Sequence, residues 1–147
     1  KVIIALVSVE SFSGNLIYNP FNFQNFNLQS ISLKLNGTSV PFTTIECDFD
    51  NNETGMAYLS LLHCLWGLYM NKSNGITLPE YSNGYCLYGF DLTPNGTAGD
   101  AFQLIREGTL SLSIKLREAK THPITVIAYL EYDGLIKIHN DNSVTVT

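Results

Sequence analysis

Alternation of hydrophobic and polar residues dominates this chain and predicts a protein built mainly of β-strands. Leucine or isoleucine occupies every second position of residues 109–116, with serine or lysine between them, as in a strand with one buried face. Residues 2–9 form a nearly continuous apolar run, which indicates a strand buried on both faces. Residues 31–35 and 38–42 flank Asn36-Gly37, a pair typical of a tight hairpin turn because both turn positions need a positive φ.

Further strands are predicted in the second half of the chain. Residues 84–92 are rich in aromatic side chains, and residues 124–132 are β-branched and aromatic, which favours extended structure. Asp133-Gly134 predicts a second hairpin turn between residues 124–132 and a strand at 135–138. Residues 144–146 complete the set of expected strands.

One segment has the spacing of a helix instead. Its apolar residues, from Ala57 to Tyr69, recur three or four positions apart, which predicts a helix near residues 56–69, with Gly75 and Pro79 marking its exit. The chain is therefore predicted to be all-β, an antiparallel jelly-roll β-sandwich with one short inserted α-helix. Its 147 residues fit a single domain, 1–147.

The composition points towards protein partners. Charged residues make up only 14%, while 14 Asn, 12 Ser and 12 Thr supply the polarity. The net charge of −5 and the scattered basic residues argue against binding to the phosphates of nucleic acid. A surface of uncharged polar and aromatic groups is better suited to packing against other protein.

The three cysteines, Cys47, Cys64 and Cys86, are odd in number and contain no C-x-x-C pair. We therefore expect free, buried thiols and a reducing compartment. No apolar run approaches the roughly 18 residues of a membrane-spanning helix, and no membrane partner is expected. The first residue is Lys1, without an initiator Met, so we expect the chain to be a piece of a longer protein.

No constellation of residues points to catalysis, a metal or a cofactor. The histidines His63, His122 and His139 stand in separate contexts, and no close-spaced ligand pairs of a zinc site occur. Residues 48–53 begin like a calcium loop, but the loop positions that need Gly and Glu hold Glu53 and Leu59. A polar turn leading into the helix, with Asn51, Asn52 or Thr54 as N-cap, is the better interpretation. We expect no enzyme activity.

An ordered series of short motifs resembles the C-terminal part of the major capsid protein of Maverick/Polinton elements and adintovirus-like viruses. In chain order these are Ser11-Phe12-Ser13-Gly14, Asn19-Pro20-Phe21-Asn22-Phe23, Ile31 to Gly37, Pro41, Ala57-Tyr58, Glu80-Tyr81, Asn83-Gly84-Tyr85, Phe90 to Pro94, Gly108 to Leu112 and Ala128 to Tyr132. The resemblance extends over nearly the whole chain.

This resemblance implies a capsid protein with two jelly rolls side by side, of which the chain is the second. Three such proteins form a pseudo-hexameric capsomer, so the implied partners are copies of itself in a homotrimer and neighbouring capsomers, and the implied location is the virion, after synthesis in the host cytoplasm or nucleus. Candidate subunit-interface residues are Asn19, Pro20, Phe21, Phe23, Phe26, Tyr81 and Tyr85.

Two alternatives remain open from the residues. The three phenylalanines of residues 21–26 either cover an interface or fill the core of their own domain. A jelly-roll binding module, lectin-like or domesticated in a host, is the alternative function, because exposed Tyr and Asn side chains suit a sugar site.

Overall fold

The computed structural model describes residues 1–65, 73–92, 108–131, 136–139 and 143–146. Its elements, in chain order, are β1 (Val2–Ser8), α1 (Val9–Phe12), β2 (Leu28–Leu35), β3 (Thr38–Glu46), α2 (Gly55–Cys64), α4 (Leu78–Ser82), β4 (Leu87–Phe90), β5 (Leu110–Leu116), β6 (Ile124–Leu130), β7 (Ile136–Ile138) and β8 (Val144–Val146).

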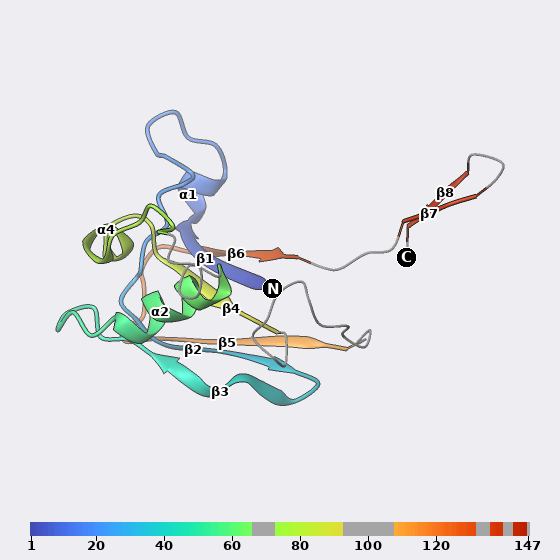
Figure 1. The fold of residues 1–147 in the computed structure, drawn as a ribbon. Coiled ribbons are helices and arrows are strands. Elements are labelled where there is room, and N and C mark those ends of the chain that lie inside the picture. The colour runs from blue at the N-terminus through green and yellow to red at the C-terminus, as the bar shows by residue number, and fades with distance from the viewer. Residues whose placement is uncertain (66–72, 93–107, 132–135, 140–142, 147) are drawn as a thin grey trace.

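Two antiparallel sheets of three strands face each other and confirm the predicted β-sandwich (Figure 1). The strand order is β4-β1-β6 in one sheet and β3-β2-β5 in the other. Every connection between consecutive strands from β1 to β6, except the β2–β3 hairpin, crosses from one sheet to the other. This winding is that of a jelly roll, but a complete jelly roll has eight strands, and six of the described strands lie in these two sheets.

The hairpin predicted at Asn36-Gly37 is confirmed. Both residues have positive φ, 51° and 83°, as a type I′ turn requires. The side-chain oxygen of Asn36 also accepts a hydrogen bond from the backbone N–H of Thr109 at 2.9 Å. The turn therefore joins β2 to β3 and also fixes the entry into β5.

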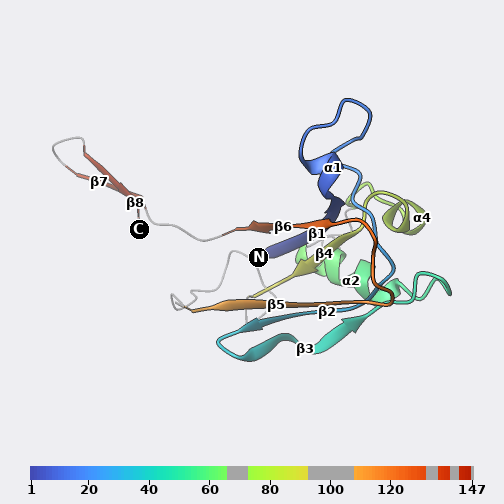
Figure 2. The same ribbon diagram turned by 180° about the vertical axis from the view of Figure 1, so that it is seen from behind.

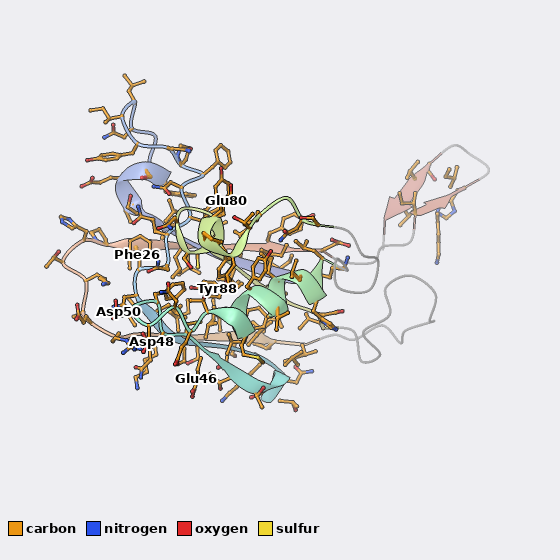
Figure 3. The ribbon with its side chains drawn as sticks, turned by 60° about the vertical axis from the view of Figure 1, so that its left-hand side comes forward. Phe26, Glu46, Asp48, Asp50, Glu80 and Tyr88 are labelled. Carbon is orange, nitrogen blue, oxygen red and sulfur yellow. The ribbon has the colours of Figure 1, made fainter. Side chains whose placement is uncertain are left out.

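The core lies between the sheets and is filled mainly by alternate residues of the central strands. Leu6 of β1 and Ile31 of β2 are almost completely buried, and Tyr88 and Phe90 of β4 belong to the same buried core. Figure 3 shows Tyr88 in the interior of the molecule. Ala5 and Val7, on the other face of β1, are buried as well, so this strand is covered on both faces as its sequence predicts.

Helix α2 confirms the start of the predicted helix, and residues 66–69 lie outside the described part of the chain. Thr54 is the N-cap residue, although its side chain makes no capping hydrogen bond. Ala57, Leu61 and Cys64 form the buried face of the helix. This face packs on β4, and the helix also contacts β3.

In the part of the chain that the structure describes, two further helices correct the prediction of a single helix. α1 is one short turn that begins directly after β1, with the Ser8 side chain capping it. α4 begins with a capping box between Thr77 and Glu80 and has Pro79 in its first turn. Pro79 therefore starts a helix rather than marking the exit of the preceding one, because proline is well tolerated in a first turn.

The C-terminal hairpin also differs from the prediction. β7 pairs with β8 and not with β6, so the predicted pairing of residues 124–132 with residues 135–138 is wrong. The predicted turn, Asp133-Gly134, lies outside the described residues. β6 pairs along its whole length with β1 instead. The β7–β8 hairpin lies apart from the two main sheets (Figures 1 and 2).

Candidate protein-interaction loop

An exposed apolar loop, residues 12–21, is the candidate functional surface. It rises from the body between α1 and the chain leading into β2 (Figure 1). The side chains of Leu16, Ile17 and Phe21 have relative exposures of 107%, 85% and 71%. Phe12 and Tyr18 are exposed as well. We call these five side chains the apolar loop surface.

Asparagine side chains hold the loop in its turns. The Asn15 side-chain oxygen accepts a hydrogen bond from the Ile17 N–H at 2.8 Å. The Asn19 oxygen accepts one from the Phe21 N–H at 2.9 Å. Such turns let a short polar side chain replace a backbone partner. Two backbone N–H groups of the loop are thus satisfied locally, while its apolar side chains are exposed to solvent.

Phe23 anchors the C-terminal end of the loop to the segment between α4 and β4. Its N–H donates to the Gly84 carbonyl at 2.9 Å, and its own carbonyl accepts from the Cys86 N–H at 3.0 Å. The Phe23 and Phe21 rings meet edge to face with centroids 6.4 Å apart. Tyr85, paired with Phe23 through an isolated β-bridge, is half exposed at 51%.

The structure therefore brings together most of the interface candidates. Asn19 and Pro20 are exposed and form the turn that presents Phe21. Phe23 is half-buried and serves more as the attachment of the loop than as its exposed surface.

Two candidates correct the sequence-based assignment. Tyr81 is fully buried, because α4 turns its ring inward against Tyr58, with centroids 5.4 Å apart. Phe26 is partly buried and packs against the core. Both residues fill their own domain, as the alternative interpretation for the phenylalanines expects.

Sequence reasoning missed the most exposed part of this surface. Leu16, Ile17 and Tyr18 form an apolar triplet between Asn15 and Asn19. Turn-forming residues on both sides exclude the triplet from a strand. An apolar run inside an asparagine-rich loop is therefore the sequence signal that could have revealed this surface.

A mixed-charge hollow of about 640 Å³ lies beside the turn that follows β3. Arg117 forms an ion pair with Asp48 at 2.9 Å. Hydrogen bonds from Asn51 and the nearby Arg117 charge hold the pKa of Asp48 below its usual value. Figure 3 shows Asp48 and Asp50 on this turn. In the described ranges, no group of three or more His, Cys, Asp or Glu side chains is placed to hold a metal ion.

A second hollow, of about 520 Å³, is lined largely by amides. Asn22, Asn25 and Asn83 contribute to its wall, together with Lys120 and Phe26. The Asn25 side chain donates to the Ser82 carbonyl at 3.0 Å, which fixes the wall between the loop and α4. We call this the amide hollow.

The cysteines are free and buried, as predicted. Burial raises the pKa of the Cys47 thiol to about 12 and that of Cys86 to about 11. Both thiols are therefore protonated at neutral pH, and a protonated buried thiol is a poor nucleophile.

A comparison with curated proteins finds a distant relative. The chain is 28% identical over 142 residues to an uncharacterized protein of Caenorhabditis elegans, F54H12.2, and the match covers 94% of this chain and 34% of that protein. The chain thus spans about a third of the length of this relative. No family model and no solved structure matches the chain. Among the described residues, no helix is long and apolar enough to cross a membrane.

Proposed function

We propose that this domain is a structural building block of a capsid, which works by packing side by side with other copies and carries out no reaction. The apolar loop surface is the observation that carries the proposal. Soluble monomers rarely expose contiguous apolar patches of this kind unless the patch is functional. Aromatic residues such as Phe21 and Tyr18 are also enriched at protein interfaces.

The charge of the chain supports a protein partner over nucleic acid. The net charge of −5 opposes association with phosphates, whereas the loop offers uncharged contacts. A stable specific interface buries at least about 1,000 Å² in total. The loop surface and the half-exposed Tyr85 beside it supply an apolar centre for such an interface.

The resemblance to the major capsid proteins of Maverick/Polinton elements and adintovirus-like viruses makes the proposal more specific about the assembly. On this basis the chain is the second of two jelly rolls, and the whole protein assembles as a homotrimer into a pseudo-hexameric capsomer. Neighbouring capsomers are then its further partners, and the virion is its location.

Substitution of the loop tests the proposal. In the full-length protein, Leu16→Ser, Ile17→Ser and Phe21→Ser are combined, and the molar mass is measured by light scattering after size exclusion. We expect the trimer to be lost while the far-ultraviolet circular dichroism spectrum stays that of a folded protein, because all three side chains face solvent in the single domain. Leu78→Ser, at a 43% exposed position on α4, is the matched control and should keep the trimer. An unchanged oligomer in the triple variant contradicts the proposed use of this loop.

The amide hollow supports a second candidate, a glycan-binding module. Its asparagine side chains and Phe26 resemble the combination of amides and an aromatic ring that suits a sugar. A glycan array with the full-length protein tests this candidate, with Asn25→Ala as the control variant. Binding of a glycan that Asn25→Ala abolishes would favour this function over a purely structural one.

A further inference from the structure

The two open sides of the β-sandwich differ in whether another element covers them. On one side α2 lies along the edge strand β4, where the Ser60 hydroxyl donates to the Gly89 carbonyl, and Leu61 enters the core fully buried. Figure 1 shows α2 across the space between β4 and β3. On the other side, β5 and β6 are the edge strands, and no described strand pairs with their outer edges. Figure 2 shows these two strands on the side opposite to α2.

Inward-facing side chains on the β5–β6 side are incompletely buried. Leu6 and Val126 are direct partners on β1 and β6, yet Leu6 is 1% exposed and Val126 is 45% exposed. The partners of Ile31 and Leu33 on β5, Ile114 and Leu112, are likewise only half-buried. The hydrophobic core therefore ends in apolar side chains that face solvent on this side.

Backbone hydrogen bonds show that the same residues present free pairing groups. Lys1 and Glu131 exchange hydrogen bonds at 3.0 Å and 2.9 Å, so the odd-numbered residues of β6 face β1. Because antiparallel pairing alternates along a strand, Val126 and Ala128 point their N–H and C=O groups away from β1, to the outer edge.

The same reasoning applies to β5. The Thr109 carbonyl accepts from the Asn36 N–H, and the Arg117 N–H donates to the Asn27 carbonyl. These bonds direct the odd-numbered residues to β2, so Leu112 and Ile114 direct their backbone groups to the free edge. Unprotected strand edges of this length are normally paired or covered.

We propose that two further strands of the same polypeptide, from the part of the longer protein outside residues 1–147, pair with the outer edges of β6 and β5 and close the core. Two added strands bring the six strands that the described residues place in the sandwich to the eight of a jelly roll. They also cover a face that is continuous with the core of this chain, which a domain ordinarily closes with its own residues.

The length of the relative and the position of Lys1 support this occupant. The match covers only 34% of the C. elegans protein, so that protein has ample chain to supply two strands. In the structure, Lys1 lies beside the end of β6, at the border of the open side. The β7–β8 hairpin, by contrast, lies away from β5 and β6 (Figure 2).

Amide hydrogen exchange in the full-length protein tests the proposal. The amides of Val126, Ala128, Leu112 and Ile114 report on the outer edges, and those of Ile127 and Ser113 are internal controls that already face β1 and β2. We expect the edge amides to exchange as slowly as the controls, at least about 100-fold slower than unprotected amides. Fast exchange at the edges beside slow controls overturns the proposal, and so does protection that is lost on dilution, because that indicates a second copy as occupant.

A substitution provides an independent measurement. Val126→Lys in the full-length protein should strongly lower the melting temperature, because the added strand would bury the charge. Leu59→Lys, at an equally exposed position of α2 (46%), should leave it nearly unchanged. Equal melting temperatures for both variants contradict strand addition. Neither readout depends on oligomer assembly, so this inference and the proposed function fail separately.

Discussion

Leu6 and Val126 sit opposite each other on paired strands and point to the same face of one sheet, yet only Leu6 is buried. Their side chains differ in environment because β1 is a central strand and β6 is an edge strand. This contrast separates two kinds of exposed apolar residue in the protein. Val126 lies at the solvent-exposed border of the described core, whereas Leu16, Ile17 and Phe21 lie on a loop outside that core.

On the side of the sandwich that α2 covers, Leu61 is expected to contribute strongly to the stability of the fold. Leu61→Ala removes a fully buried side chain of α2 and should lower the free energy of unfolding by about 2–5 kcal/mol. Leu59→Ala changes a 46% exposed neighbour on the same helix and should cost less than about 0.5 kcal/mol. Urea unfolding of the two variants checks the difference. Similar losses would mean that α2 does not pack as described.

Gly89 allows α2 to approach β4 closely. A Cβ atom at this position would lie 2.6 Å from the Cys64 Cβ and 3.0 Å from the Leu61 Cα, so Gly89→Ala should destabilise the domain by about 1–3 kcal/mol. Gly55→Ala is the control, because a Cβ there meets nothing within 4 Å and alanine is the better helix former. Thermal melts should show a loss for the first variant and none for the second.

Buried thiols should make the fold sensitive to alkali. In the unfolded chain a thiol ionises near its ordinary pKa of about 8.5, whereas burial raises the pKa of Cys86 to about 11 and of Cys47 to about 12 in the folded protein. Between these values only the unfolded state loses the protons, so the free energy of unfolding should fall as the pH rises above about 8.5. This contribution is fully present at lower pH.

Urea titrations at pH 7.5 and pH 10 measure this dependence. Cys47→Ala removes one of the titrating groups and should reduce the fall in stability between the two pH values. A decline of the same size in wild type and variant would contradict the role of the Cys47 thiol.

Tyr81 and Phe21 should respond to substitution in opposite ways. Tyr81→Ala empties a fully buried aromatic site and should cost about 3–5 kcal/mol of stability. Phe21→Ser replaces a 71% exposed ring and should leave the melting temperature nearly unchanged. Circular dichroism melts of the two variants distinguish them. If Phe21→Ser unfolds the domain, the ring is a core residue and does not belong to the loop surface.

Local periodicity was sufficient to predict most of the strands and the Asn36-Gly37 turn. These features depend on alternation and turn chemistry within a few residues. Helix α4 could also have been predicted, because Thr77 and Glu80 form a capping box around Pro79. The helix is short and stands among segments with strand patterns, so this signal was missed. The inward position of Tyr81 follows from that helix and could not be predicted without it.

Other features depend on contacts that periodicity does not encode. Val126 occupies an inward position of β6, and nothing in residues 124–130 shows which strand edge has a partner. Likewise, nothing in residues 136–138 shows that β7 pairs with β8 instead of β6. The apolar loop surface likewise arises because the Asn15 and Asn19 turns hold Leu16 and Ile17 outside the sandwich.

The molar mass of the full-length protein in solution tests the central claim, that this domain serves protein assembly, most directly. Sedimentation velocity at several protein and salt concentrations measures that mass, and electron microscopy of the same samples detects larger shells. Assembly through uncharged apolar contacts predicts trimers or particles that persist at high salt, because salt screens charges and does not weaken apolar burial. A protein that remains monomeric under every condition contradicts the claim.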